Sequence, residues 1–250
     1  MQVQDPLSPL SMPTSELPLP LRRRALGLLI LVILAPSLGT LAALWWWPGS
    51  CGSAIYGLCK LVLYGVPTVV AWQTITRAQF VRGLRAGVRP AAILWGIGSG
   101  AVIGTVILVG WFGFVSGQLD LAALREVVKA NGLDEPGRYW AMAIWLSVGN
   151  ALLEEFVFRW FVDSRLKQLG LWIGLAIPFS ALIFTAHHVL VLMAYFPAVP
   201  TILCSLGVFV GGLLWSWLLR RHESLMPGYL SHMLVDLAIF VVGASMLFGG

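Results

Sequence analysis

The chain has 250 residues, of which 58% are hydrophobic and 11% are charged, and its mean hydropathy is +0.86. A soluble domain carries about 25% charged residues, so these values exclude an ordinary soluble protein and indicate an integral membrane protein. The net charge of +5 does not indicate a nucleic-acid partner, because the basic residues lie at the ends of apolar segments and form no basic tail.

The N-terminal region divides into a polar tail and a first span. Residues 1–21 contain five prolines and no apolar periodicity, which predicts a disordered tail. Arg22, Arg23 and Arg24 then precede an apolar run from Ala25 to Trp47. A signal peptide has an apolar region of about 7–15 residues, so this longer run predicts an uncleaved membrane helix.

Seven segments are long and apolar enough to cross a bilayer, at about 20 residues per crossing. The segment 119–131 has helical spacing but is too short and too charged, so we expect a surface helix there. The fold class is therefore all-α, a polytopic membrane bundle of about seven helices. The expected spans are residues 25–47, 54–75, 91–115, 139–162, 171–195, 199–219 and 225–247.

Arginine and lysine gather in alternate loops, as they do on the cytoplasmic side of membrane proteins. This rule places the N-terminus in the cytoplasm and the C-terminus outside. We see no internal repeat, which argues against a transporter built from inverted halves. The residues concerned are Arg22–Arg24, Arg77, Arg82, Arg85, Arg89, Arg165, Lys167, Arg220 and Arg221.

The fourth span carries three charged residues within six positions: Glu154, Glu155 and Arg159. A charge at the centre of a bilayer costs roughly 2.5–3.5 kcal/mol on insertion scales, so these groups must pair, face a wet cavity or take part in chemistry. Two later spans add His187–His188 and His232 with Asp236. We expect one shared polar site.

Helical spacing predicts which of these groups are neighbours. Residues four apart share a face, so Glu155 should pair with Arg159, and His232 should lie beside Asp236. Glu154 is turned about 100° from Glu155 and is expected to lack a partner in its own helix. By residue count it lies roughly 13 Å from the cytoplasmic end of its span and His188 roughly 25 Å, so a shared site requires tilt or a protruding helix.

These residue types suit the hydrolysis of a bond by an activated water. A carboxylate and a histidine can hold and deprotonate water. A second histidine with a hydrogen-bonding neighbour can stabilise the oxyanion that forms on a peptide carbonyl. Ser147 and Ser231 lie near but not in a GxSxG setting, and Cys51, Cys59 and Cys204 have no metal-type spacing, so we expect the cysteines to be packing residues.

Three motifs in order resemble one family. Residues 154–159 match EExxxR, residues 184–188 match FxxxH with His188 as the histidine, and residues 232–236 match HxxxN/D. Together they resemble the CPBP family of CaaX-type prenyl endopeptidases and their bacterial relatives, also called ABI proteins or glutamic intramembrane proteases. The resemblance covers about residues 139–240. It implies a catalytic core at 139–250, after a tail at 1–21 and a variable membrane region at 22–138.

The resemblance also implies roles. Glu154 would be the general base and His188 its partner on the water, while His232 and Asp236 would line the oxyanion side. Glu155 and Arg159 would support the site, and His187 would be a packing residue. At the position of Asp236, the better-known members of the family that this chain resembles have an asparagine. An Asn amide donates a hydrogen bond, whereas Asp236 donates only when protonated, or else it orients His232.

We therefore expect an intramembrane endopeptidase that uses no cofactor or metal and acts on a membrane-anchored protein or peptide. Its expected location is a cell membrane, namely a bacterial inner membrane. Two alternatives stay open. One is a zinc protease with Glu154, His188 and His232 as ligands, although HExxH is absent. The other is a non-catalytic scaffold, immunity protein or proton-coupled carrier. The sequence decides neither the substrate, nor its prenylation, nor the oligomeric state.

Overall fold

A computed structural model describes residues 18–115, 122–130 and 132–249 of the chain. Within these residues the fold is helical without strands, and seven helices are long and apolar enough to cross a membrane. The expected all-α bundle of seven spans is thereby confirmed. Most of the expected tail, residues 1–17, and part of the expected surface helix lie outside the described residues. The cytoplasmic placement of the N-terminus stays a prediction from the arginine distribution.

The helices follow one another with short connections, and several include π-helical stretches, labelled η. The described elements are α1 (Leu19–Leu41), η2 (Ala42–Trp46), α2 (Ser50–Thr74), α3 (Arg77–Gly87), α4 (Pro90–Gly110), η3 (Trp111–Val115), α5 (Ala122–Ala130), α6 (Pro136–Trp145), η4 (Leu146–Asn150), α7 (Ala151–Glu154), η5 (Glu155–Val162), α8 (Asp163–Gln168), α9 (Ile173–Tyr195), α10 (Ala198–His222) and α11 (Met226–Phe248).

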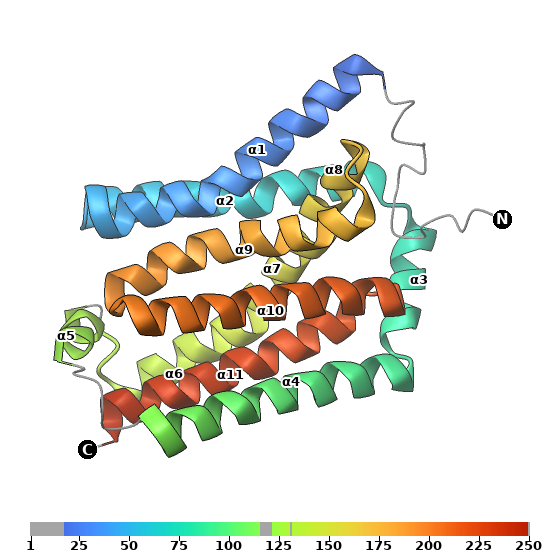
Figure 1. Cartoon of the computed structure of the whole chain (residues 1–250). Helices are drawn as coiled ribbons and strands as arrows, with labels where there is room; N and C mark the ends of the chain where they lie inside the picture. The colour runs from blue at the N-terminus through green and yellow to red at the C-terminus, as the bar shows by residue number, and fades with distance from the viewer. Residues whose placement is uncertain (1–17, 116–121, 131, 250) are drawn as a thin grey trace.

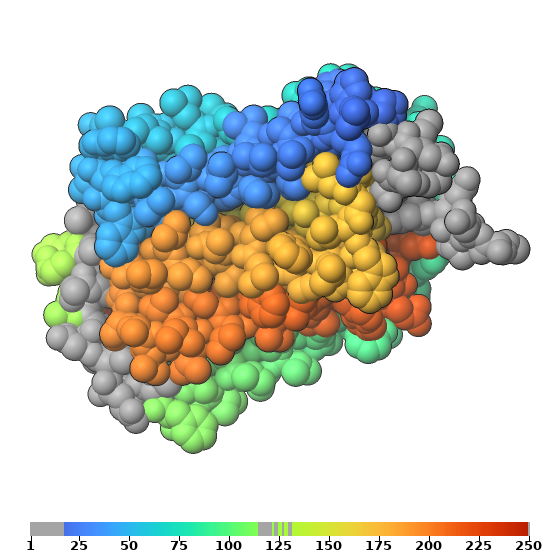
Figure 2. Space-filling model, turned by 45° about the horizontal axis from the view of Figure 1, so that its top comes forward, coloured from blue at the N-terminus to red at the C-terminus, as the bar shows by residue number. Residues whose placement is uncertain are grey.

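The long helices pack as neighbouring pairs (Figure 1). Helix α1 lies along α2, α9 along α10, and α11 along α4, while the α6–α8 stretch crosses behind α9 and α10. The last pair is close because α4 presents glycines: a Cβ at Gly96 or Gly100 would come within 2.8 Å of a carbonyl oxygen of α11. Small residues allow such approach in membrane bundles. In Figure 2, α1, α9 and α10 meet along one face of the molecule.

The structure departs from the sequence prediction at the start of α1 and in the loop that follows α2. Helix α1 begins at Leu19 rather than 25, with a proline at its first turn, where the missing N–H has no helical partner to lose. Residues 77–89, expected as a basic loop, contain helix α3. Its start is fixed by a capping box in which Thr76 accepts from the Gln79 backbone and the Gln79 side chain accepts from the Thr76 backbone.

The fourth span is longer and less regular than expected. It runs from Pro136 to Gln168 rather than 139–162, as one helical stretch in which α and π turns alternate. The two π segments flank α7, so Glu154 ends the short α-helical turn between them and Glu155 begins the second π segment. π turns insert extra residues per turn and recur at functional sites. The angle between successive side chains around the helix axis therefore differs here from that of a uniform α-helix.

Candidate active site

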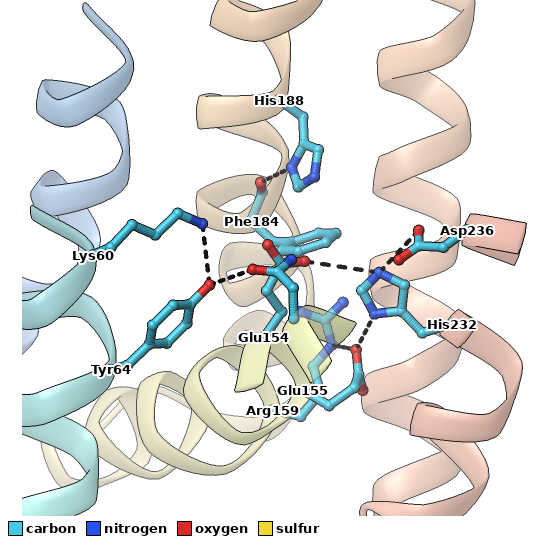
Figure 3. A network of polar contacts seen from close by, with 10 residues as sticks. Lys60, Tyr64, Glu154, Glu155, Arg159, Phe184, His188, His232 and Asp236 are labelled. Carbon is cyan, nitrogen blue, oxygen red and sulfur yellow. Dashed lines mark hydrogen bonds and ion pairs between the residues drawn. The ribbon is translucent and has the colours of Figure 1, made fainter. Parts of the chain in front are cut away.

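His232 and Glu155 form the tightest polar contact at the centre of the bundle (Figure 3). His232 Nδ1 lies 3.0 Å from Glu155 Oε1, and Arg159 Nε lies 3.5 Å from the same oxygen. The expected pairing of Glu155 with Arg159 is confirmed. Because an arginine keeps its charge, Glu155 next to it is an ionised acceptor, so Nδ1 of His232 carries the hydrogen. This leaves Nε2 of His232 facing the remaining carboxylates.

Those carboxylates are Glu154 and Asp236. His232 Nε2 lies 3.8 Å from Glu154 Oε2 and 3.6 Å from Asp236 Oδ1, both too long for hydrogen bonds. Glu154 is 5% exposed, whereas the Asp236 side chain is 20% exposed. The motif residues of two separate spans thus converge on one imidazole ring.

Glu154 lies beside one polar residue of its own helix. The Asn150 side chain, four residues earlier, interacts with its carboxylate. Asn150 ends the π-helical η4 and Glu154 ends the short α7, so the two side chains share a face across this turn.

His188 enters the site from α9. Its Nδ1 lies 2.9 Å from the carbonyl oxygen of Phe184, and because a carbonyl only accepts, Nδ1 carries the hydrogen. His188 and His232 are therefore anchored alike, each through Nδ1–H, with Nε2 left for the site. This shared arrangement suits two rings that must present Nε2 to reacting atoms.

Ligand-type atoms of Glu154, His187 and His188 lie within 4.8 Å of one another, so this trio has donors that could hold a metal ion. It differs from the zinc set expected from the sequence, which had His232 in place of His187. His187 is buried, its ring stacks on Phe158 with centroids 5.7 Å apart, and its Nδ1 has no hydrogen-bond partner among the described residues.

The expected difference in depth between Glu154 and His188 disappears. Since the fourth helical stretch continues to Gln168, Glu154 lies 14 residues from its end, roughly 21 Å, and His188 lies 15 residues from the start of α9, roughly 23 Å. Asp163 accepts a 2.6 Å hydrogen bond from Arg220 at the end of α10. Helix α8 continues for five residues past Asp163, so the turn from α8 to α9 lies farther from the site than the contact between Asp163 and Arg220.

Aromatic side chains form the walls of the site. The Trp215 ring stacks on His232 with centroids 3.9 Å apart, and its Nε1 donates to Ser231 Oγ at 3.1 Å. The Arg159 guanidinium lies 4.5 Å from the centre of the Phe184 ring and 5.3 Å from that of Trp215. Because Arg159 is 1% exposed and its nitrogens make no hydrogen bond within the described residues, these ring faces and Glu155 compensate its charge.

Two residues of helix α2, not predicted from the sequence, reach the same network. Lys60 Nζ donates to the Tyr64 hydroxyl at 3.1 Å, and that hydroxyl donates to Asn150 Oδ1 at 2.7 Å. Figure 3 shows both side chains pointing from α2 toward Glu154. The available signal was a lone lysine within an apolar span, a placement that indicates function in membrane proteins. No motif drew attention to it.

Fold and site together define a multi-pass helical membrane protein with a buried carboxylate–histidine cluster. Residues 136–238 match the model of a protein family described as type II CAAX prenyl endopeptidase Rce1-like. The family resemblance expected from the three motifs is confirmed over this region, and the family implies a membrane protease. Comparisons with curated proteins and with solved structures found no match.

Proposed function

We propose that the protein is an intramembrane endopeptidase in which Glu154 and His188 activate a water for attack on a peptide bond. The observation that carries this proposal is the convergence of Glu154, His188 and His232, from three different helical stretches, within a site of low exposure. The match of residues 136–238 to a protease family supports the same class of reaction.

The reaction divides among these groups. Glu154 takes a proton from the water while Nε2 of His188 orients the same water, and the water oxygen attacks the peptide carbonyl. A His232 ring that carries hydrogens on both nitrogens and a protonated Asp236 donate toward the oxyanion that develops on that carbonyl. Glu154 then gives its proton to the amide nitrogen as the oxyanion re-forms the carbonyl and the C–N bond breaks, so the amine leaves and Glu154 is again ionised.

The substrate is proposed to be a protein or peptide held in the membrane, because the site lies within helices of membrane-spanning length. The family description makes a prenylated C-terminus one candidate and other membrane-anchored peptides another. The proposed location is a cell membrane, as the seven apolar helices require, and a bacterial inner membrane is the proposed membrane.

Cleavage of a membrane-anchored reporter peptide by purified protein tests the proposal. Glu154→Gln keeps the shape of the side chain but removes the base, so we expect a loss of about 10²- to 10⁴-fold in rate. Glu135→Gln is the matched control, because Glu135 is exposed and pairs only with the exposed Arg138 among the described residues. Normal turnover by the Glu154 variant would rule out the glutamate mechanism.

A further inference from the structure

Lys60 is a cation within a membrane span that has no carboxylate partner at ion-pair distance among the described residues. It lies ten residues from the start of α2, roughly 15 Å along the helix axis. Its ammonium contacts the Tyr64 hydroxyl and lies 5.5 and 5.2 Å from the centres of the Tyr56 and Tyr64 rings. A charge at this depth is costly to maintain, which indicates a role beyond packing.

The chain of contacts that begins at Lys60 has a fixed direction. An ammonium only donates, so the Tyr64 oxygen accepts from it, and the single hydroxyl hydrogen of Tyr64 goes to Asn150 Oδ1. With its oxygen engaged by Tyr64, Asn150 has its amide hydrogens to offer to Glu154, with which its side chain interacts. The reverse orientation of the amide would set an oxygen against a carboxylate. The contacts from Lys60 through Tyr64 thus favour the amide orientation that gives Glu154 a donor.

We propose that Lys60 and Tyr64 are positioning residues for the hydrolytic reaction, which act through Asn150 to hold the Glu154 carboxylate in its working orientation. This inference rests on the proposed function, in which Glu154 is the base. It also gives a role to a helix outside the family match, because α2 ends at Thr74 and the match begins at residue 136. The second span then helps to position the catalytic glutamate.

Polar and charged groups of α2, α9 and α11 surround Glu154, and the proposal concerns those of α2. His232 and Asp236 of α11 lie on one side of Glu154, whereas Lys60 and Tyr64 of α2 approach from the other (Figure 3). The α2 residues can therefore act on the carboxylate from the side away from His232 and Asp236. The groups in electrostatic contact with Glu154 are Lys60, Tyr64, Arg159, His188, His232 and Asp236.

Steady-state kinetics of four variants tests the proposal. Lys60→Met and Tyr64→Phe each break the chain, and we expect kcat to fall about 10- to 100-fold, the scale of one hydrogen bond to a charged group, with KM within about twofold of wild type. Lys60→Arg keeps a charged donor and should restore most of kcat. Tyr56→Phe is the matched control: it retains the ring near Lys60 and removes a hydroxyl outside the chain, so kcat should be unchanged.

A second readout does not depend on activity. The infrared carboxylate band of Glu154, obtained as the difference between wild type and Glu154→Gln, should shift in Lys60→Met and in Tyr64→Phe, and should return in Lys60→Arg. An active Glu154→Gln would defeat the proposed function, while this band would still report on the chain of contacts. The positioning role is overturned if Tyr64→Phe and Lys60→Met keep wild-type kcat and an unshifted band. It is equally overturned if they raise KM alone, which would make Lys60 a substrate contact.

Discussion

His232 Nδ1 lies 3.0 Å from Glu155 Oε1, so the second glutamate of the pair orients the histidine of a helix 77 residues away in sequence. Glu155 accepts from His232 and neutralises Arg159 at the same time. It therefore joins the electrostatic support of the site to its chemistry. A change at Glu155 should affect both the stability of the fold and the rate of the reaction.

Glu155→Gln tests this double role. The change leaves the buried Arg159 without a carboxylate, and breaking a buried pair on one side costs about 3–5 kcal/mol in the free energy of unfolding. The double variant Glu155→Leu/Arg159→Met removes both charges and should recover much of that stability, yet remain inactive because His232 Nδ1 loses its acceptor. Unfolding in detergent and reporter cleavage measure the two effects. A double variant less stable than either single one would contradict the pairing.

Gly228→Ala probes the same contact by steric means. A Cβ at Gly228 would lie 2.8 Å from Glu155 Oε2 and 3.5 Å from the Trp215 backbone oxygen. Glu155 cannot swing away freely, because Arg159 and His232 hold its other oxygen. We expect a loss of about 1–3 kcal/mol in stability, together with reduced cleavage.

Gly65→Ala is the matched control for this variant, because Gly65 is also within a helix and a Cβ added there would meet no described atom within 4 Å. Its stability should be unchanged or slightly higher. Equal behaviour of the two alanine variants would show that the space around Glu155 is not restricted.

The two adjacent histidines should differ in activity. His188 is anchored through Nδ1 to Phe184, which leaves Nε2 for the water, so His188→Ala should be inactive. His187 stacks on Phe158 and should be replaceable, with His187→Ala retaining most cleavage. A chelator in the same assay should leave the wild-type rate unchanged. Loss of activity in His187→Ala together with inhibition by chelator would instead favour a metal held by Glu154, His187 and His188.

Hydropathy predicted the seven spans because each is a long apolar run, which a bilayer requires whatever its neighbours are. Spacing predicted the Glu155–Arg159 pair because both residues belong to one helix. The contact of Glu155 with His232 could not be found in this way, since it depends on how α11 packs against the fourth span. The π turns next to Glu154 and Glu155 likewise have no simple periodic signal.

Helix α3 and Lys60 are different cases, because their signals were present in the sequence. Thr76 and Gln79 have the spacing of a capping box, which marks the start of a helix within an apparently basic loop. Lys60 was a single charge in an otherwise apolar span. Its connection to Glu154 runs through Tyr64 and Asn150, and that connection requires two spans to be placed side by side.

Asp236 has two candidate roles, and the geometry favours one of them. If it orients His232, it must be an ionised acceptor close to the ring. However, Asp236 Oδ1 is 3.6 Å from His232 Nε2, whereas Glu155 already holds Nδ1 at 3.0 Å. The orienting role is therefore filled by Glu155. Asp236, with its side chain 20% exposed at the edge of the cluster, is left free to donate to the oxyanion when protonated.

The pH–rate profile of Asp236→Asn follows from this assignment. A protonated Asp236 loses its donor as pH rises through its titration, so wild-type activity should decline there. The Asn amide donates at every pH, so Asp236→Asn should keep wild-type activity at low pH and extend it to higher pH. If Asp236 were instead an ionised acceptor for a protonated His232, the Asn variant would lose activity most strongly above neutral pH. A folded but inactive Asn variant would therefore contradict the donor role.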